Sequence, residues 1–297
     1  MNKKVICFGE VLWDNFGTVR TIGGAPLNVC YHLSKANVDA SIISQVGNDA
    51  LGEGILDKIE QWGFFGAFCE RTDKHPTSIV SVELLPGNEV RYDIKEQVAW
   101  DYIGYRKDVE KQIQDSDAFI YGTLAARAER SRETLLLYLR SAKWPILDLN
   151  LRPPYVEGQV LLPLIQAAHT LKLNSEELEF VCQLIKGDGR AIATGTTLLF
   201  SHFPNLKEIL LTKGAKGATH ITPENQTDIE GVSVIVQDTV GSGDSFLAGF
   251  VAARLQGNSV ARSMQMAVTL SAFVATRQGA CPGYTLFDLE NLKTIVL

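Results

Sequence analysis

The sequence predicts an α/β fold in which a mainly parallel, doubly wound sheet is flanked by helices and carries a small separate sheet. Short apolar segments alternate with helical segments along most of the chain, which is typical of βαβ units. The expected buried strands are Val5–Phe8, Ala40–Val46, Ala118–Tyr121, Pro145–Leu149, Thr170–Leu173 and Glu208–Thr212. The expected helices are Asn28–Lys35, Gly52–Trp62, Arg130–Ala142, Glu176–Ile185 and Thr196–Ser201. Ligands of such sheets bind beyond the C-terminal strand ends, so we expect functional residues just after strands.

One region interrupts this alternation and predicts a β-hairpin. Ser78–Leu85 and Glu89–Ile94 are alternating segments joined by Pro86-Gly87-Asn88. Together with residues around Phe16–Ile22, they are expected to form a small antiparallel sheet that acts as a lid, at about residues 12–24 and 76–100. Because no Gly/Ser linker marks a boundary, residues 1–297 are expected to form a single domain.

Composition excludes several classes of protein. The 297 residues carry a net charge of −6, which argues against an extended nucleic-acid surface. No apolar stretch approaches the ~20 residues that span a bilayer, and Gly9-Glu10 interrupts the N-terminal apolar run too early for a signal peptide. The five cysteines are widely spaced, with no C-x-x-C pair, which indicates reduced thiols in a cytoplasmic protein.

The segment Asp238–Phe250 carries the strongest functional signal. It is interpreted as a strand end, a glycine turn and the start of a helix. Gly241 and Gly243 allow the backbone to approach a ligand closely, and the free N–H groups of a helix start favour a phosphate. Asp244 lies at the mouth of this site, where a carboxylate could take a proton from a hydroxyl that attacks a phosphoryl group. The alternative is that Asp244 only caps the helix.

The string Asp238-Thr239-Val240-Gly241-Ser242-Gly243-Asp244-Ser245-Phe246 closely resembles the C-terminal signature D-T-x-G-A/S-G-D-x-F of the PfkB, or ribokinase-like, carbohydrate kinases. This resemblance implies a ribokinase-like fold with Asp244 as catalytic base. It also implies that Gly241, Ser242 and Gly243, with Asp244, present amides that stabilise the transferred phosphoryl group. The string from Gly23 to Leu33 looks like the N-terminal signature of the same family.

The resemblance also implies substrate-binding residues. Asp14 after the first strand is expected to bind two sugar hydroxyls, since a carboxylate can accept two hydrogen bonds; the alternative is a turn former. Gly24 and Asn28 are expected to contact the sugar as well. Arg152 belongs to a segment that resembles the family element D-x-N-x-R and is expected to contact sugar or an anion. Asp49 is either a helix cap or a residue that orients the sugar loop.

The nucleotide and ion sites follow from weaker elements. Asn174 and Glu177 have the N-x-x-E spacing that the family ties to phosphate and to Mg²⁺, with the Glu acting through water; the same spacing is a capping box, and both interpretations can hold. Thr212, Gly214 and Gly217 resemble the family's nucleotide loop. Asp238, with the segment Ala275–Ala280, resembles a site for a monovalent cation such as K⁺.

These residues predict an ATP- and Mg²⁺-dependent kinase that phosphorylates the primary hydroxyl of a sugar. The G-G-A-P-x-N-V string is most similar to bacterial fructokinases, so the expected reaction is fructose to fructose 6-phosphate. Ribose, 2-keto-3-deoxygluconate or a nucleoside are alternative acceptors, and a non-catalytic sugar- or nucleotide-binding regulator is the alternative from another class. No nucleic-acid or membrane partner is expected. A homodimer through the lid is left open, with Ile79, Val82 and Leu84 as the hint.

Overall fold

The main sheet of the protein is mostly parallel. The computed structural model describes residues 3–15, 20–64, 66–84, 90–187, 189, 191–285, 287–289 and 292. The strands of this sheet are β1 Lys4–Phe8, β4 Asp39–Gly47, β5 Cys69–Thr72, β8 Ala118–Gly122, β9 Pro145–Asp148, β10 Thr170–Asn174, β11 Glu208–Thr212, β12 Ala218–Ile221 and β13 Gln226–Ile229. Among the described residues their order is β13-β12-β11-β10-β9-β8-β1-β4-β5. All neighbours pair in parallel except β11–β12 and β12–β13, which are antiparallel.

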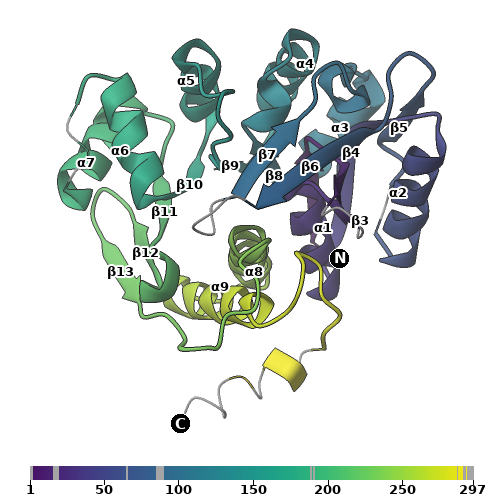
Figure 1. Ribbon diagram of the computed structural model, residues 1–297. Helices are drawn as coiled ribbons and strands as arrows, with labels where there is room; N and C mark the ends of the chain where they lie inside the picture. The colour runs from purple at the N-terminus through teal and green to yellow at the C-terminus, as the bar shows by residue number, and fades with distance from the viewer. Residues whose placement is uncertain are drawn as a thin grey trace.

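Helices cover both faces of this sheet (Figure 1). They are α1 Ala25–Lys35, α2 Ala50–Gln61, α3 Lys107–Asp115, α4 Glu129–Leu139, α5 Gly158–Ala167, α6 Ser175–Leu184, α7 Ile192–His202, α8 Ser242–Leu255 and α9 Val260–Ala275, with 3₁₀ turns η1 Ala99–Tyr102, η2 Leu124–Ala126 and η3 Gly214–Lys216. Because successive strand residues point to opposite faces, Val5 and Cys7 pack with α1, α2, α8 and α9, whereas Ile6 and Phe8 pack with α3 to α7. The two cores therefore lie on either side of the sheet, whose strand β8 is buried throughout.

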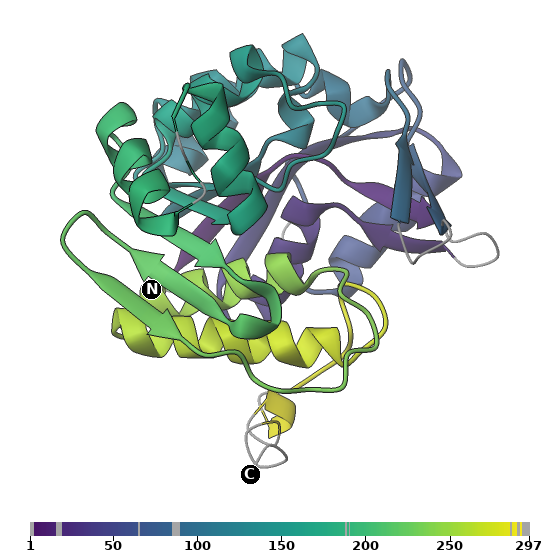
Figure 2. The same ribbon diagram turned by 60° about the vertical axis from the view of Figure 1, so that its left-hand side comes forward.

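A second, smaller sheet stands beside the main one. Its strands are β2 Leu12–Asn15, β3 Arg20–Gly23, β6 Ser78–Leu84 and β7 Val90–Ile94, in the order β3-β2-β6-β7. The hairpin of β6 and β7 projects from the end of the molecule where β1 and β4 lie, as Figure 2 shows. The sheet is mixed and not purely antiparallel as expected, because β2 pairs in parallel with β6. Residues 16–19 and 85–89 of the predicted lid lie outside the described residues, as do the side chains of Val82 and Leu84.

The predicted fold class is confirmed, and each strand and helix predicted for the main sheet is present with shifted ends. One local prediction is wrong. The apolar segment before the Asp238 signature was expected to be a strand, but residues 231–237 form no strand or helix. Val232 and Val234 pack against the core while Ile235 is 92% exposed. The alternation of apolar side chains there reflects a loop lying on the surface of α9 and the sheet edge. The strands β5, β12 and β13 were not predicted.

The topology places one crevice at the C-terminal edge of the sheet. β1 lies between β4 and β8. The chain therefore passes from β1 to β4 on one side and only later forms β8 on the other side. Such a switch in strand order opens a space above the strand ends. Gly9 and Glu10 follow β1 there, and Thr123 follows β8. No helix within the described residues is long and apolar enough to cross a membrane.

Candidate active site

A cavity of about 250 Å³ lies above the C-terminal strand ends, between the main sheet, the small sheet and the first turn of α8. Leu12 and Asp14 from β2, with Val80 and Ile94 from the hairpin, form the wall on the side of the small sheet. The predicted residues that line this cavity are Asp14, Gly24, Asn28, Arg152, Gly241, Gly243 and Asp244. Residues more than 200 positions apart in the chain therefore meet in one space, as the two signature strings predict.

Asp244 occupies the first turn of α8 and is almost fully buried at 7% exposure. Burial raises the pKa of its carboxyl group, while Lys172, the Asn28 amide and Arg152 oppose that rise. Asn28 donates from Nδ2 to Asp244 Oδ2 at 2.8 Å. The carboxylate thus has a fixed orientation and an open side toward the cavity, which suits a group that accepts a proton from a bound hydroxyl.

The turn that leads into α8 can be made only by glycine. Gly241 has a φ of +76°, and a Cβ atom there would lie 2.5 Å from the Cα atom of Ala280. The first N–H groups of a helix have no partner within the helix, so those of Gly243 and Asp244 can point at an anion. The Ser242 N–H instead donates to the Thr239 carbonyl at 3.2 Å, so its predicted role in binding phosphate would require that bond to open.

Asp14 projects from β2 toward the same cavity. Its carboxyl group lies against Gly23, where a Cβ atom would be 2.2 Å from Oδ2. Burial raises the pKa of Asp14 to about 6, and the nearby Arg152 guanidinium opposes that rise. Because this pKa still lies below 7, the ionised form of Asp14 predominates at neutral pH. That form can accept hydrogen bonds from two hydroxyls.

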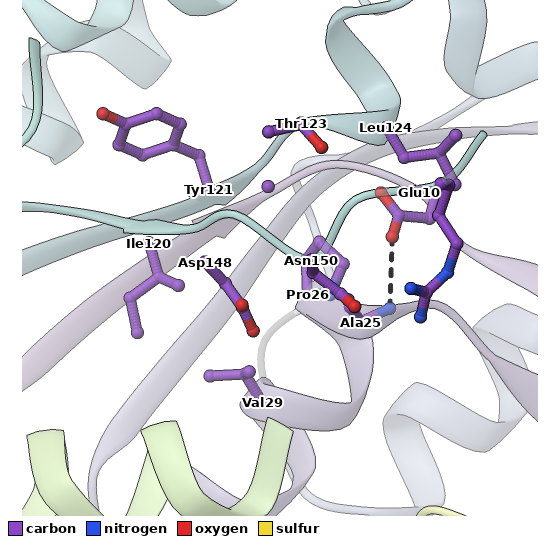
Figure 3. Close-up of a pocket in the computed structure, with 12 residues that line it drawn as sticks. Glu10, Ala25, Pro26, Val29, Ile120, Tyr121, Thr123, Leu124, Asp148 and Asn150 are labelled. Carbon is purple, nitrogen blue, oxygen red and sulfur yellow. Dashed lines mark hydrogen bonds between the residues drawn. The ribbon is translucent and has the colours of Figure 1, made fainter. Parts of the chain in front are cut away.

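Glu10, which the sequence analysis overlooked, forms part of the floor of the cavity. Its Oε1 accepts from the Ala25 N–H at 3.2 Å, and Oε2 is buried with no hydrogen-bond partner in the described part of the chain. Burial raises its pKa to about 7. A smaller space of about 20 Å³, shown in Figure 3, adjoins Glu10, Asn150 and Asp148 and is large enough for one water molecule. An acidic residue directly after an apolar strand was the signal available in the sequence.

A buried ion pair lies beneath Asp244 and was not predicted either. Lys172 on β10 donates to Asp148 Oδ1 and Oδ2 on β9 at 2.8 and 2.9 Å, and the two residues are direct neighbours across the parallel strands. Burial raises the pKa of Asp148 to about 6, opposed by Lys172. A lysine between two leucines in a predicted buried strand was the available signal.

The predicted nucleotide residues lie outside the lining of this cavity, farther along the same sheet edge. Asn174 and Thr212 are paired in register at the ends of β10 and β11. Gly214 and Gly217 shape the turn between β11 and β12, with φ values of +56° and +91°. Glu177 accepts from the N–H groups of Leu151 and Asn174, both at 2.8 Å, which completes the capping box.

Two further predicted residues have local structural roles. Asp238 accepts from the Val240 N–H at 3.0 Å and from the Gly279 N–H at 2.9 Å, so it joins the loop before α8 to the segment after α9. Asp49 caps α2 through the Gly52 N–H and also accepts from the Thr77 N–H at 2.9 Å. Of the two interpretations of Asp49, the helix cap is the one that the structure shows.

Comparison with known proteins shows which family this site belongs to. The family model described as pfkB family carbohydrate kinase matches residues 2–285. The chain belongs to the pfkB family of carbohydrate kinases. Among curated members, the chain is 24% identical to probable fructokinase-7 of Arabidopsis thaliana over 96% of this chain and 90% of that protein.

Solved structures of pfkB-family kinases share the fold. The fructokinase of Xylella fastidiosa, solved with bound ATP, superposes with a TM-score of 0.88 at 22% identity and 99% coverage of both chains. A double mutant of the fructokinase of Vibrio cholerae O395, solved with fructose, ADP and a potassium ion, superposes with a TM-score of 0.82 at 20% identity, covering 99% of this chain and 98% of that one. At these identities the match concerns the fold.

Proposed function

We propose that this pfkB-family kinase transfers the γ-phosphoryl group of ATP to the primary hydroxyl of fructose, giving fructose 6-phosphate. The observation that carries the proposal is the position of Asp244. Its buried carboxyl group lies at the start of α8, in the same cavity as Asp14, so a base, a phosphate site and a diol-binding carboxylate meet in one space. The named fructokinases among its relatives support fructose as the acceptor.

The sugar would lie between the main sheet and the small sheet, with Asp14 accepting hydrogen bonds from two of its hydroxyls. Gly24 would contact the sugar, and the local backbone requires glycine there, because a Cβ atom would lie 2.3 Å from the Glu10 carbonyl oxygen. The oxygen of the primary hydroxyl attacks the γ-phosphorus of ATP and the bond from phosphorus to ADP breaks. Asp244 takes the proton of that hydroxyl in the same step. The amides of Gly243 and Asp244 stabilise the charge on the phosphoryl group.

ATP would lie along the edge formed by Asn174, Thr212, Gly214 and Gly217. Mg²⁺ bound together with ATP would supply positive charge that offsets the negative charge of the phosphates. Among the described residues, no group of three or more His, Cys, Asp or Glu side chains is arranged to hold a metal ion. This fits an ion held mainly by phosphates and water, with Glu177 contributing through water. Potassium is proposed at Asp238, where the segment 275–280 offers backbone carbonyls.

The small sheet, within the single unit of residues 1–297, is proposed to close over the sugar and exclude water, which would suppress ATP hydrolysis. A homodimer through the outer face of this sheet, around Ile79, is proposed as well, and light scattering of the purified protein tests it. The cytoplasmic location stays a prediction from the cysteine pattern. None of the five cysteines forms a disulfide bond within the described part of the chain.

An ADP-release assay with a panel of acceptors tests the proposed function. Fructose is expected to give the highest kcat/KM, and Asp244→Asn is expected to lower kcat by at least about 100-fold, as for loss of a general base. Circular dichroism of the variant checks that the fold is kept. A preference for ribose, 2-keto-3-deoxygluconate or a nucleoside would replace fructose as the acceptor. Sugar binding without ADP release would mean that the protein is a regulator.

A further inference from the structure

A contribution to stability does not account well for the buried ion pair of Lys172 and Asp148. The side chains of Lys172 and Asp148 are only 8% and 5% exposed. Removing two charges from water costs about as much free energy as their attraction returns, so apolar side chains would fill such a position at least as well. The residues on either side of Lys172 in the strand, Leu171 and Leu173, are apolar and fully buried. The presence of an ammonium group there therefore calls for another explanation.

The position of the ammonium group supplies that explanation. Lys172 lines the cavity that also contains Asp244 and Asp14. Its Nζ atom lies 2.8 Å from the point where a Cβ atom on Gly243 would stand. The ammonium group is thus held against the first turn of α8, beside the amides that face an anion. Both carboxylate oxygens of Asp148 on the neighbouring strand accept hydrogen bonds from the ammonium group and fix its position.

We propose that Lys172 is a further catalytic residue, whose ammonium group contacts the phosphoryl group during its transfer, and that Asp148 is the residue that positions it. This inference rests on the proposed function. In the transfer step, the sugar oxygen forms a bond to phosphorus, the bond from phosphorus to ADP breaks, and the hydroxyl proton passes to Asp244. Lys172 keeps its proton and supplies positive charge where negative charge is spread over the moving phosphoryl oxygens.

The surrounding charges keep Lys172 in the required form. Burial disfavours its ammonium form, but Asp148 and Asp244 outweigh that effect and raise the pKa of Lys172, with Glu177 acting in the same direction. In return, Lys172 is the largest influence that opposes the burial-induced rise in the pKa of Asp244. Arg152 acts on Asp244 in the same direction as Lys172. Removing the ammonium group should therefore shift the ionisation of the base as well as weaken phosphoryl transfer.

The decisive experiment separates a structural from a catalytic role with a neutral pair. Lys172→Met alone leaves Asp148 buried without its partner, and such a variant can fail for structural reasons. The double variant Lys172→Met with Asp148→Asn replaces both charged side chains with neutral ones, so no unpaired charge remains buried at this position. If the ammonium group acts on the phosphoryl group, kcat of the double variant stays at least about 100-fold below the wild type, in the range for loss of one electrostatic donor. Recovery to within about threefold would show that the pair is only structural and would overturn the proposal.

Nucleotide binding gives a second readout that does not depend on turnover. The non-hydrolysable analogue AMP-PNP has a γ-phosphoryl group and ADP does not. We expect the double variant to bind AMP-PNP at least about tenfold more weakly, as expected for loss of a charged hydrogen bond, and ADP as the wild type does. Equal weakening of both nucleotides would contradict a contact with the transferred group. If no acceptor is turned over, the proposed function fails while this comparison still tests Lys172.

A matched control removes a lysine from an ion pair at the surface. Lys3 donates to Asp117 at 2.9 Å, and its side chain is 49% exposed. Lys3→Met should leave kcat and both nucleotide affinities unchanged, because exposed pairs contribute little. The acid limb of the pH–kcat profile adds a third check. It should move to higher pH in Lys172→Met, which loses the ammonium group and keeps the Asp148 carboxyl group, and it should stay in place in Lys3→Met.

Discussion

Asn28 and Asp244 lie 216 positions apart in the chain, yet the side-chain amide of Asn28 donates directly to the carboxylate of Asp244 at 2.8 Å. The oxygen of the same side-chain amide also has a hydrogen-bond partner, since the Cys281 thiol donates to Asn28 Oδ1 at 3.4 Å. This arrangement fixes the amide with its N–H₂ group toward the carboxylate. Asn28 was predicted to bind sugar, and the structure shows that it also orients the Asp244 carboxylate, which is proposed as the base.

The first prediction concerns Asn28. Asn28→Leu should lower kcat by about 10–100-fold, because a hydrogen bond to a charged group contributes about 1.5–3 kcal/mol. The amide lowers the pKa of Asp244, so its loss should also move the acid limb of the pH–kcat profile to higher pH. Steady-state kinetics between pH 5 and 9 measure both effects. A higher KM with an unmoved profile would mean that Asn28 only binds sugar. Asn205→Ala serves as control, since Asn205 is exposed and bonds only the Gln166 carbonyl among the described contacts.

The second prediction uses two glycines with similar backbone angles. Gly241 and Gly257 have φ values of +76° and +84°. A Cβ atom at Gly257 would meet nothing within 4 Å, whereas one at Gly241 would lie 2.5 Å from Ala280. Gly257→Ala should cost only the backbone strain of about 1–2 kcal/mol. Gly241→Ala should cost roughly 1–3 kcal/mol more, from the collision.

Denaturant unfolding of both variants measures this difference in the free energy of unfolding. Gly241→Ala should also lose most of its activity, because Ala280 or the start of α8 must move, whereas Gly257→Ala should keep it. Equal stability losses would show that the turn before α8 can relax around a side chain. In that case the close approach to Ala280 would not be what demands glycine at position 241.

The sequence predicted β1, β4 and β8 to β11 of the main sheet, because buried parallel strands are continuous apolar runs, but it did not predict β5, β12 and β13. It also predicted that Asn28 and Asp244 share one site through two strings of specific spacing, and Asp14 was added from its place after the first strand. It did not reveal the contacts of Lys172 with Asp148, since those depend on the register of two strands whose pairing only the folded sheet defines. The segment around Ile235 was misjudged because alternating apolar residues on a surface loop look like a strand.

The third prediction concerns Glu10 and the dependence of stability on pH. The folded state raises the pKa of Glu10 from 4.5 to about 7, because burial disfavours the charged form. The folded protein therefore binds more protons than the unfolded chain over this range. The stability associated with the protonated group is complete below about pH 4.5 and is lost as the pH rises through about 7.

Glu10→Gln removes this titration. The variant should gain stability relative to the wild type as the pH rises from 5 to 8, by no more than about 3 kcal/mol. Unfolding in urea at both pH values measures the change. A difference between variant and wild type that does not vary with pH would show that Glu10 is ionised throughout in the folded protein. Glu224→Gln, at an exposed position in the turn after β12, is the control.

The fourth prediction concerns the base of the small sheet, where Arg127 is enclosed on several sides. Its guanidinium group pairs with both carboxylate oxygens of Asp101 at 2.8 and 2.9 Å. It also lies over the rings of Trp100 and Tyr155, at 4.1 and 4.7 Å from their centres. Its remaining N–H groups reach the carbonyls of Ile94 and Lys95, at the end of β7. Since Ile94 lines the cavity, Arg127 holds one edge of the proposed sugar site.

Arg127→Met should therefore loosen the end of β7 in addition to destabilising the fold. Leaving Asp101 buried without its partner should cost about 3–5 kcal/mol, and the added substitution Asp101→Asn should recover part of that loss. The double variant is expected to show a higher KM for the sugar and faster ATP hydrolysis without sugar, because the small sheet would exclude water less well. Arg71→Met, which removes an exposed bidentate pair with Glu53, is the control and should change neither quantity. If the stabilised double variant had the KM and the hydrolysis rate of the wild type, Arg127 would hold the fold together without controlling the sugar site.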